Sequence, residues 1–523
     1  MEPEHVNDQS MNGAESLLRT LVASGVEVCF ANPGTSEMHF VSAIDRVEGM
    51  RPVLGLFEGV VTGMADGYGR MAQRPAATLL HLGPGLANGL ANLHNARRAA
   101  SPIVNLVGDH ATYHAQFDAP LASDIVGFAR PVSGWLHSST SPGSVAVDGA
   151  RAVQAARQAP GQIATLIVPA DVAWLDAGAP AEPLPVPGPA QASAAAVAST
   201  VTALRNGKRT AVLIRGAALR GDGLIAAGRI AAATGAQLFC DTFAPRLERG
   251  AGRVVVERLP YFAEQLVSTL EPFEQLVLVG ATPPVAFFAY PGKPSWCSPE
   301  GAAIIHLAHP HEDGVGALVA VADDLGAPTS GLAVAPLTLG DEPTGQLDQF
   351  SVGTIVARLL PEGAIVSDEA ATSGLGSAIA LATAAPHDCL SLTGGAIGQG
   401  LPLAGGAAVA CPDRKVVCLH GDGGAMYTVQ ALWTMAREHL DVTTVIFANR
   451  SYGILNIELQ RVGADSGPQA LSMLDIGNPD LDWVSLATGM GVEAVRTDTV
   501  DGFRDAFASA MGQRGPRLIE VVL

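Results

Sequence analysis

The feature that most constrains the fold of this chain is a regular alternation of short apolar runs with longer segments of helical character. The runs are GVEVCF, PVLGLF, ATLLHL and PIVNLVG in the first third, TAVLIRG, AQLFCD, QLVLVG and AAIIHL in the second, and AIVSD, CLSLTGG, KVVCLHGDG, TTVIFAN and RLIEVVL in the third. Short apolar strands that alternate with helices are typical of parallel sheets covered on both faces. Ligands of such sheets bind at the carboxyl ends of the strands, so the residues that follow the runs are the first candidates for function.

Two Pro-rich stretches divide this pattern into three parts. Residues 177–196 are rich in Pro and Ala, and residues 326–349 mix Pro, Gly and Thr, which is typical of exposed connections. A chain of 523 residues is too long for one ordinary domain, and its 48% hydrophobic and 15% charged residues suffice for several cores. We therefore predict an α/β protein of three doubly wound parallel-sheet domains, at residues 11–180, 190–330 and 345–523.

Charge and cysteine content argue against several classes of protein. A formal net charge of -19 repels phosphate backbones, so we expect no nucleic-acid partner. The sequence has no uncharged apolar run of about 18 residues, so we expect no membrane span. Its first residues also lack the apolar centre of a signal peptide. The six cysteines have no metal-binding spacing, and we interpret them as buried thiols of a cytoplasmic protein.

The stretch HGDGG, at residues 420–424, follows one apolar run, and Asn449 ends the next. If these two strands are neighbours, the Asp422 carboxylate and the Asn449 amide lie together at the edge of the sheet. Oxygen ligands of this kind suit Mg²⁺ that holds a diphosphate, and glycine lets the backbone approach a ligand closely. The alternative is that Asp422 caps a helix, expected over residues 426–439, and that Asn449 forms a turn.

The full pattern has 25 residues between Gly423 and Asn449, followed by Tyr452 and Gly453. It resembles the cofactor motif of the thiamine-diphosphate superfamily of 2-oxo acid decarboxylases, acetolactate synthases and pyruvate oxidases. The resemblance implies that Mg²⁺ is bound by Asp422, Asn449 and the main-chain carbonyl of Ser451. It also implies that the cofactor lies against Gly421, Gly423, Gly424 and Tyr452.

The first domain carries a matching glutamate. Glu58 follows the run PVLGLF and precedes Ala65-Asp66-Gly67-Tyr68, as the superfamily's catalytic glutamate does. By the resemblance, Glu58 hydrogen-bonds the cofactor's aminopyrimidine and exchanges a proton with it, a task for which burial can raise a carboxyl pKa. The alternative is that Glu58 only stabilises the start of a helix.

Two further segments resemble benzoylformate decarboxylases. One is Asn32-Pro33-Gly34-Thr35-Ser36-Glu37, where the resemblance implies that Thr35 contacts the substrate and Gly34 the cofactor. The other is LLHLGPG, in which His81 coincides with an active-site histidine that can relay protons. The alternatives are an ordinary Asn-Pro-Gly turn and a structural histidine. Acetolactate synthases usually have a small hydroxyl residue at the position of His81.

The last domain resembles the superfamily in two more segments. Thr372, in VSDEAATSG, is the best-placed hydroxyl for the diphosphate. In LTGGAIGQG, Gly395 matches a main-chain acceptor for the aminopyrimidine, and Ile397 matches the apolar residue that bends the cofactor. The implied domains are pyrimidine-binding, central and diphosphate-binding, in that order.

The central domain resembles the superfamily in pattern only. It has no convincing flavin motif, so we expect that FAD is not required. Benzoylformate decarboxylases have a second active-site histidine in the segment that here reads Phe287-Phe288-Ala289-Tyr290. This departure puts the same substrate in doubt.

The resemblance implies decarboxylation of a 2-oxo acid with thiamine diphosphate and Mg²⁺, followed by aldehyde release or by carboligation as in acetolactate synthases. The alternatives are a non-ligating decarboxylase of the benzoylformate type, a 2-hydroxyacyl coenzyme A lyase, a flavin oxidase, and a cofactor-binding protein without turnover. The implied assembly is a homodimer or homotetramer with the site between subunits, Glu58 coming from one and Asp422 from the other.

Overall fold

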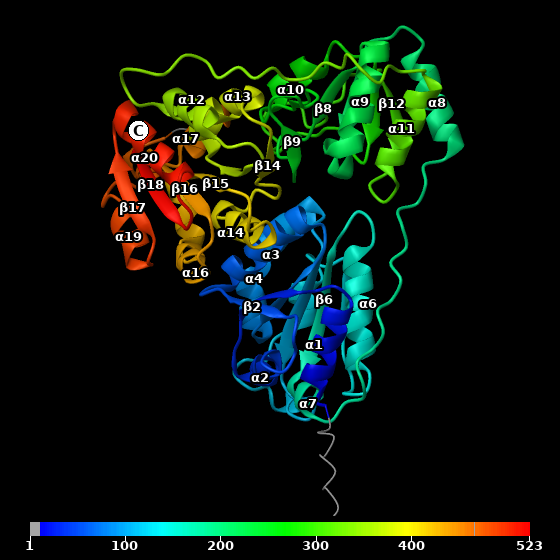
Figure 1. Ribbon diagram of the computed structural model, residues 1–523, viewed down its shortest axis with the longest axis vertical. Helices are drawn as coiled ribbons and strands as arrows, with labels where there is room; N and C mark the ends of the chain where they lie inside the picture. The colour runs from blue at the N-terminus through cyan, green and yellow to red at the C-terminus, as the bar shows by residue number, and fades with distance from the viewer. Residues whose placement is uncertain (1–10, 465) are drawn as a thin grey trace, which may run out of the picture. The chain divides into compact units, whose positions relative to one another are not determined.

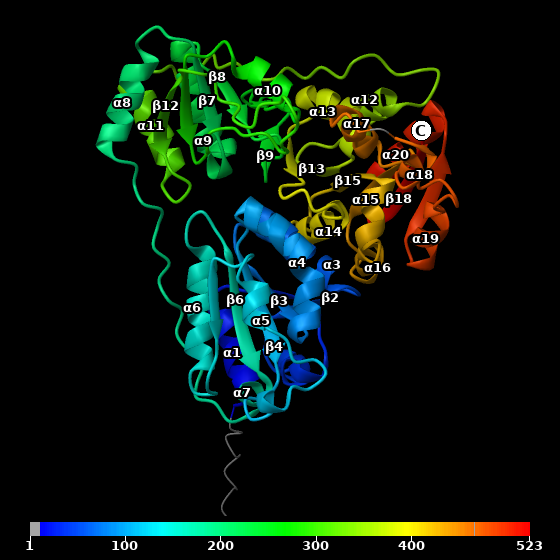
Figure 2. The ribbon, with the colours of Figure 1, turned by 180° about the vertical axis from the view of Figure 1, so that it is seen from behind.

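The computed structural model describes residues 11–464 and 466–523 (Figures 1 and 2). The chain forms two compact units. One contains the residues up to Pro187 together with Gly405–Cys411, and the other contains Gly188–Ala404 and Pro412–Leu523. Three sheets, composed mainly of parallel strands, form their framework. The predicted fold class is confirmed, whereas the three domain boundaries stay a prediction.

The first unit is built on a six-stranded sheet with the order β2-β1-β3-β4-β6-β5, all neighbours being parallel. Its strands are β1 (Val28–Asn32), β2 (Arg51–Leu54), β3 (Ala76–Leu80), β4 (Ile103–Asp109), β5 (Trp135–Ser138) and β6 (Ile163–Pro169). Strand β1 lies between β2 and β3, so the chain reverses its winding direction there. Sheets of this kind bind ligands at that switch point.

Helices cover both faces of this sheet. They are α1 (Gly13–Ala23), α2 (Met38–Ile44), α3 (Glu58–Ala72), α4 (Leu82–Ala99), α5 (Ile125–Ala129), α6 (Val145–Arg157) and α7 (Ala170–Trp174), with short 3₁₀ helices η1 (Thr35–Glu37) and η2 (Ala115–Phe117). Alternate strand residues, such as Cys29 and Ala31 on β1, join one core with α1 and α6. Helices α3 and α4 pack on each other and against the strands.

The second unit contains a five-stranded parallel sheet with the order β10-β8-β7-β11-β12. Residues of β7 alternate between two cores, because Val212 and Ile214 pack in one, whereas Ala211 and Leu213 pack in the other. The strands are β7 (Thr210–Ile214), β8 (Gln237–Cys240), β10 (Glu257–Arg258), β11 (Gln275–Val279) and β12 (Ala303–Ala308). The associated helices are α8 (Ala194–Leu204), η3 (Gly216–Leu219), α9 (Gly221–Thr234), α10 (Ala263–Leu270) and α11 (Gly314–Asp324).

A seven-stranded sheet completes the second unit, with the order β17-β18-β16-β15-β13-β14-β9. Its strands are β13 (Ile365–Glu369), β14 (His387–Ser391), β15 (Val416–Gly421), β16 (Val442–Ala448), β17 (Glu493–Thr497), β18 (Arg517–Val522) and the antiparallel edge strand β9 (Leu247–Arg249). Winding reverses between β13 and β15. The strands that follow β13 in the chain therefore lie on both sides of it.

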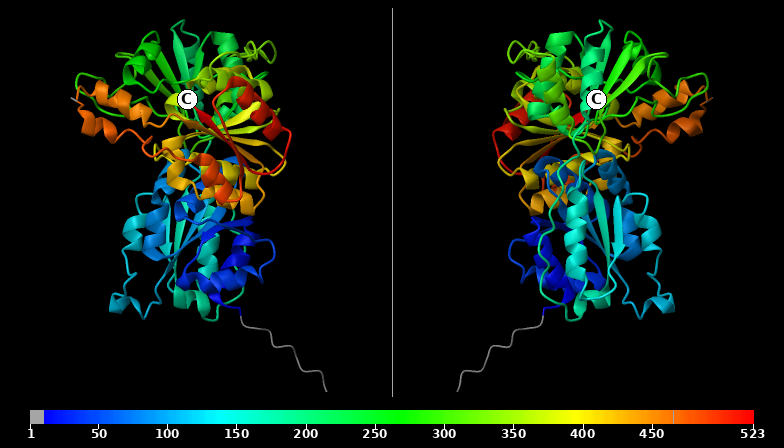
Figure 3. Two further views of the ribbon diagram at one scale, coloured as in Figure 1. Left: turned by 90° about the vertical axis from the view of Figure 1, so that its left-hand side faces the viewer. Right: turned by 90° about the vertical axis from the view of Figure 1, so that its right-hand side faces the viewer.

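Helices also flank this sheet (Figure 3). They are α12 (Gln349–Leu359), η4 (Ala371–Gly374), α13 (Leu375–Ala380), η5 (Leu381–Thr383), α15 (Asp422–Ala425), η6 (Met426–Thr428), α16 (Ala431–Arg437), α17 (Gly453–Arg461), α18 (Pro468–Ser472), α19 (Trp483–Gly489) and α20 (Val500–Met511). Helix α14 (Gly400–Ala410) begins in this unit, and its residues from Gly405 onward belong to the first unit. Local signals fix some boundaries. Asp348 caps α12 by accepting the N–H groups of Phe350 and Ser351, and the Ser351 hydroxyl accepts the Asp348 N–H in return.

The sequence reading missed several elements and was wrong about one helix. It did not anticipate strands β5, β6, β9, β10 and β17. The helix expected over residues 426–439 is interrupted, because η6 ends at Thr428 and α16 begins at Ala431. Thr428 donates its hydroxyl to Gly398 O at 2.7 Å, a contact that holds this turn against another loop. No strand or helix lies between α7 and α8 or between α11 and α12, where the linkers were predicted.

Among the described residues, no helix is both long and apolar enough to cross a bilayer. The five cysteines Cys29, Cys240, Cys297, Cys389 and Cys418 are buried, and none of the six forms a disulfide. Burial raises the pKa values of the Cys29 and Cys240 thiols to about 12, so neither forms the reactive thiolate at neutral pH.

Candidate active site

Three neighbouring strands of the first unit carry the predicted catalytic residues at their carboxyl ends. The Asn-Pro-Gly turn follows β1, Glu58 follows β2 as the first residue of α3, and His81 follows β3 directly. These strands meet at the switch point of the sheet. The structure therefore brings Gly34, Glu58 and His81 to one edge, as the sequence predicted.

Gly85, in the first turn of α4, separates Glu58 from His81. A Cβ atom at Gly85 would lie 3.2 Å from Glu58 Oε1 and 3.3 Å from His81 Cβ, so both side chains adjoin the same small space. Glu58 is partly exposed, and its Oε2 accepts a hydrogen bond of 3.0 Å from Asn88 Nδ2 on α4. The other carboxylate oxygen, Oε1, is the one that adjoins Gly85.

The Asn-Pro-Gly turn lies against the histidine. A Cβ atom at Gly34 would lie 2.3 Å from His81 Cγ, so only glycine fits here without moving the imidazole. Thr35 begins η1 and is exposed, which leaves it accessible to a ligand. The turn itself is tied to the residue that directly follows β2 by a 2.9 Å hydrogen bond from Asn32 Nδ2 to Gly55 O.

A second carboxylate, to which the sequence reading assigned no role, contacts His81. Glu37 is fully buried, its Oε2 lies 2.7 Å from His81 Nδ1, and the same oxygen accepts the Gly34 N–H at 2.8 Å. Burial raises the pKa of Glu37 above its usual range, although the Gly34 N–H and His81 act in the opposite direction. The signal in the sequence is that Glu37 ends the Asn-Pro-Gly-Thr-Ser-Glu segment, which resembles benzoylformate decarboxylases.

In the second unit, the loops after β13, β14, β15 and β16 carry the predicted cofactor and metal residues. These four strands are contiguous in the sheet, in the spatial order β14-β13-β15-β16. Thr372 follows β13, Gly395 follows β14, Asp422 follows β15 and Asn449 follows β16. The register pairs Gly421 of β15 with Phe447 of β16, so Asp422 and Asn449 leave neighbouring strands at one edge, as predicted.

The Asp422 carboxylate is held by main-chain donors. Oδ1 accepts the Gly423 N–H and Oδ2 accepts the Arg450 N–H, both at 2.8 Å. Asp422 is 4% exposed, and burial raises the pKa of its carboxyl group above the usual range. The hydrogen bond from Arg450 ties the loop after β16 to the loop after β15.

Asn449 and Ser451 lie in the loop that this bond holds. Asn449 Oδ1 accepts the Ser451 N–H at 3.0 Å, and Asn449 Nδ2 donates to Ser373 Oγ at 3.2 Å. Ser451 Oγ donates to Leu474 O at 3.2 Å. These bonds fix the main chain whose carbonyl is the third predicted ligand.

Two glycines of this region are required by packing. A Cβ atom at Gly423 would lie 2.5 Å from Tyr452 Cε1, and one at Gly453 would lie 2.9 Å from Thr372 Oγ1. Tyr452 and Thr372 therefore adjoin the Asp422 and Asn449 loops. Gly421 differs, because a Cβ atom there would make only ordinary contacts of 3.9 Å.

Glu369, at the end of β13, organises the loop that contains Gly395 and Ile397. Its Oε1 accepts the Gly398 N–H and its Oε2 accepts the Gly400 N–H, both at 2.6 Å. A Cβ atom at Gly424 would lie 3.2 Å from Glu369 Oε1, which links this carboxylate to the Gly-Asp-Gly-Gly turn. The sequence reading missed Glu369, although an acidic residue that ends an apolar strand could have indicated it.

Gly395 and Ile397 extend from this loop. Gly395 has φ +76°, a conformation that favours glycine. Ile397 is 37% exposed, which is high for a large apolar side chain in an ordered loop and suits contact with a ligand. Three non-glycine residues near the predicted site also have positive φ values, namely Leu82 (52°), Ala371 (49°) and Arg450 (57°). Such strain is common at ligand-binding sites.

These residues fit thiamine diphosphate and Mg²⁺ as the resemblance implies. One carboxylate, one amide oxygen and a main-chain carbonyl are hard oxygen donors, and each carboxylate oxygen retains a lone pair beside its single main-chain bond. Within the described ranges, no three His, Cys, Asp or Glu side chains cluster as a metal site. Of the three predicted ligands, only Asp422 is one of these four residue types. The absence of such a cluster is therefore compatible with the predicted Mg²⁺ site.

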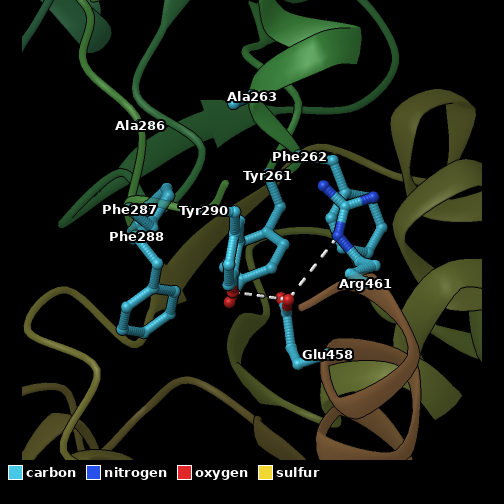
Figure 4. Close-up of a pocket in the computed structure, with 9 residues that line it drawn as sticks. All are labelled: Tyr261, Phe262, Ala263, Ala286, Phe287, Phe288, Tyr290, Glu458 and Arg461. Atoms are coloured by element: carbon cyan, nitrogen blue, oxygen red, sulfur yellow. Dashed lines mark hydrogen bonds and ion pairs between the residues drawn. The ribbon is translucent and has the colours of Figure 1, made fainter. Parts of the chain in front are cut away.

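An aromatic pocket adjoins α17, the helix that follows Tyr452 (Figure 4). Tyr290 Oη donates to Glu458 Oε2 at 2.5 Å, and the Arg461 guanidinium lies 4.2 Å from the centre of the Phe262 ring. The pocket is lined by Tyr261, Phe262, Ala263, Ala286, Phe287, Phe288, Tyr290, Glu458 and Arg461. The segment Phe287–Tyr290, where benzoylformate decarboxylases have a histidine, thus contacts α17, because Tyr290 donates a hydrogen bond to Glu458 of that helix.

Comparisons with known proteins agree with this geometry. The family model described as thiamine pyrophosphate enzyme, N-terminal TPP binding domain, matches residues 11–128, and the C-terminal TPP binding domain model matches residues 369–521. The chain is 55% identical over 520 residues to the "Putative acetolactate synthase large subunit IlvX" of Mycobacterium tuberculosis, a match that covers 98% of this chain and 99% of the relative.

Two further proteins match nearly the whole chain. Benzoylformate decarboxylase of Pseudomonas aeruginosa is 28% identical over 521 residues, with coverage of 95% of this chain and 96% of the relative. The solved structure of the thiamine diphosphate-dependent 4-hydroxybenzoylformate decarboxylase of Rhodococcus jostii RHA1 superposes with a TM-score of 0.83 at 25% identity and covers 98% of both chains. The chain therefore belongs to the thiamine pyrophosphate enzyme family, and is an enzyme of the acetolactate synthase and benzoylformate decarboxylase type.

Proposed function

We propose that this chain catalyses the Mg²⁺-dependent decarboxylation of a 2-oxo acid with thiamine diphosphate, followed by aldehyde release or carboligation. The observation that carries the proposal is the convergence of site residues at the carboxyl edges of two parallel sheets. Glu58 and His81 adjoin Gly85 in the first unit, and Asp422 and Asn449 leave neighbouring strands in the second. Thiamine diphosphate, when bound, supplies the carbon nucleophile and the electron sink for loss of CO₂.

Each residue has a task that its surroundings support. Asp422, Asn449 and the Ser451 carbonyl hold Mg²⁺ and, through it, the diphosphate, beside Gly423 and Gly424. Glu58 presents Oε1 as the proton-exchanging atom, because Asn88 engages Oε2. His81 presents Nε2 to the substrate, because Nδ1 is engaged by Glu37. Thr35 is exposed and follows Gly34, which packs against this imidazole, and it is the candidate contact for the substrate carboxylate.

A second candidate is a decarboxylase that releases the aldehyde without ligation. It is favoured by His81 at a position where acetolactate synthases usually have a small hydroxyl residue. The two decarboxylases that match nearly the whole chain support the same alternative. The relative with 55% identity supports the acetolactate-synthase alternative through its name.

The proposed assembly is a homodimer or homotetramer in which the two half-sites of one active centre come from different subunits. Mixing unfolded Glu58→Ala and Asp422→Ala variants and refolding them together tests this. Random pairing should restore about a quarter of the active sites, because half of the dimers are mixed and each has one intact site. Absence of recovery in verified heterodimers would contradict shared sites.

The reaction is tested by CO₂ release with the full-length protein, thiamine diphosphate and Mg²⁺. The substrates are pyruvate, 2-oxobutyrate, branched 2-oxo acids, phenylpyruvate and benzoylformate, and the products are identified by mass spectrometry. An aldehyde supports the decarboxylase, and an acyloin or acetolactate supports the synthase. Glu48→Gln, which changes an exposed carboxylate of the first unit, serves as the control for Glu58→Gln.

Other outcomes would replace the proposal. If the cofactor binds in a calorimetric titration but no 2-oxo acid is consumed, a thioester lyase or a binding protein becomes the better account. A bound flavin with consumption of O₂ would indicate an oxidase.

A further inference from the structure

Glu37 is a buried carboxylate placed against the imidazole that the proposed function uses. Its side chain has no exposed area, whereas that of His81 is 21% exposed. Glu37 Oε2 already accepts the Gly34 N–H at 2.8 Å, so it meets His81 Nδ1, 2.7 Å away, as an acceptor. An ionised Glu37 can only accept, so Nδ1 carries the hydrogen in that state. His81 Nε2 makes no hydrogen bond within the described part of the chain and is not enclosed, so it is the accessible nitrogen.

Two glycines shape the space around this pair. A Cβ atom at Gly108, on β4, would lie 1.7 Å from Glu37 Oε1, and one at Gly34 would overlap the His81 ring. Glu37 Oε1 has no hydrogen-bond partner among the residues that the structure describes. A buried carboxylate with one unpaired oxygen is unfavourable for folding. Capping of η1 accounts for the Gly34 bond, but it accounts neither for the contact with His81 nor for the buried second oxygen.

We propose that Glu37 is a positioning residue, which fixes His81 in the tautomer with hydrogen on Nδ1 and presents Nε2 to the substrate. This inference rests on the proposed function, in which His81 exchanges a proton with the substrate. A carboxylate behind an imidazole fixes its tautomer and orientation and makes the far nitrogen more basic. Other titratable groups on the elements around the pair are Glu58 on α3, Asp109 and His110 at the end of β4, and Asp124 before α5.

The first test is a double-mutant cycle on kcat with Glu37→Gln and His81→Gln. Gln is isosteric and keeps the oxygen that meets both Gly34 N–H and His81 Nδ1, so the loop is expected to fold, which circular dichroism checks, while the negative charge is removed. We expect Glu37→Gln to lower kcat about tenfold in the wild-type background and to have no further effect in the His81→Gln background. The control is Glu48→Gln, which should leave kcat unchanged.

The second test needs neither cofactor nor turnover. Diethyl pyrocarbonate acylates an unprotonated, accessible imidazole nitrogen, and peptide mass spectrometry follows His81 with exposed His439 as the internal reference. At a pH high enough to keep His81 unprotonated in both proteins, Glu37→Gln should slow its modification about threefold or more and leave His439 unchanged.

The inference would be overturned if Glu37→Gln lowered kcat by the same factor in the wild-type and His81→Gln backgrounds and left the reaction of His81 with diethyl pyrocarbonate unchanged. Glu37 would then be a capping residue only. If instead His81→Gln retains full kcat, the proposed role of His81 fails. The reactivity of His81 in the cofactor-free protein still tests its pairing with Glu37 in that case.

Discussion

Glu369 offers a sharp test of how the loop with Gly395 and Ile397 is held. The carboxylate is 7% exposed and accepts the N–H groups of Gly398 and Gly400, one on each oxygen, at 2.6 Å. In Glu369→Gln one acceptor remains, and the amide nitrogen faces the other N–H. The substitution thus keeps the shape of the side chain and removes one hydrogen bond and the charge.

The size of the effect follows from these contacts. Loss of one hydrogen bond to a charged acceptor, with a buried N–H left unpaired, should destabilise the protein by about 2 kcal/mol. For a unit of this size, that lowers Tm by about 3 °C. If the whole cost falls on ordering the cofactor loop, the Kd for thiamine diphosphate rises by up to about 30-fold.

Thermal unfolding followed by circular dichroism and calorimetric titration with thiamine diphosphate and Mg²⁺ measure the two quantities. Glu362→Gln, an exposed residue just before β13, is the matched control and should change neither. A Glu369→Gln protein with the Tm and the Kd of the wild type would refute the assigned role of the two hydrogen bonds.

Three further predictions concern stability and local opening. Asp66→Asn leaves Arg70 buried without its charged partner, 2.7 Å away, and should cost about 3–5 kcal/mol in urea unfolding, whereas a loss below about 1 kcal/mol would contradict this. Burial lowers the pKa of His387 to about 4, so the unfolded chain binds more protons as the pH falls from about 6.5 to 4. The free energy of unfolding should fall by about 3 kcal/mol over that range, and His387→Gln should remove this part of the slope. Tyr290→Phe removes the hydrogen bond to Glu458, and hydrogen exchange in α17 should become about fivefold faster, while an unchanged rate would show that the aromatic contacts alone hold the helix.

The sequence was informative wherever a strand was apolar on both faces and ended in a polar residue. The runs KVVCLH and TTVIFA predicted two strands, and parallel strands carry their following residues to one edge, so the proximity of Asp422 and Asn449 could be inferred. The same reasoning placed Glu58 and His81 after strands of the first sheet.

The features that escaped prediction depend on partners distant in the chain. Strand β9 (Leu247–Arg249) is short and mostly charged, and it forms because the edge of β14 is available to it. Glu37 ends the short helix η1 and Glu369 ends strand β13, and only the folded structure shows which N–H groups and imidazole their carboxylates meet. The helix break near Thr428 depends on the Gly398 carbonyl in the same way.

The measurement that tests the central claim most directly is the initial rate of CO₂ release from the best 2-oxo acid of the panel, by the full-length protein and its Glu58→Gln and Asp422→Asn variants. We predict a rate that requires both thiamine diphosphate and Mg²⁺ and that falls at least about 100-fold in Glu58→Gln. The Asp422→Asn variant should lose activity through weaker binding of the metal and the cofactor. Release of CO₂ that persists without thiamine diphosphate, or at the wild-type rate in Glu58→Gln, would contradict the account.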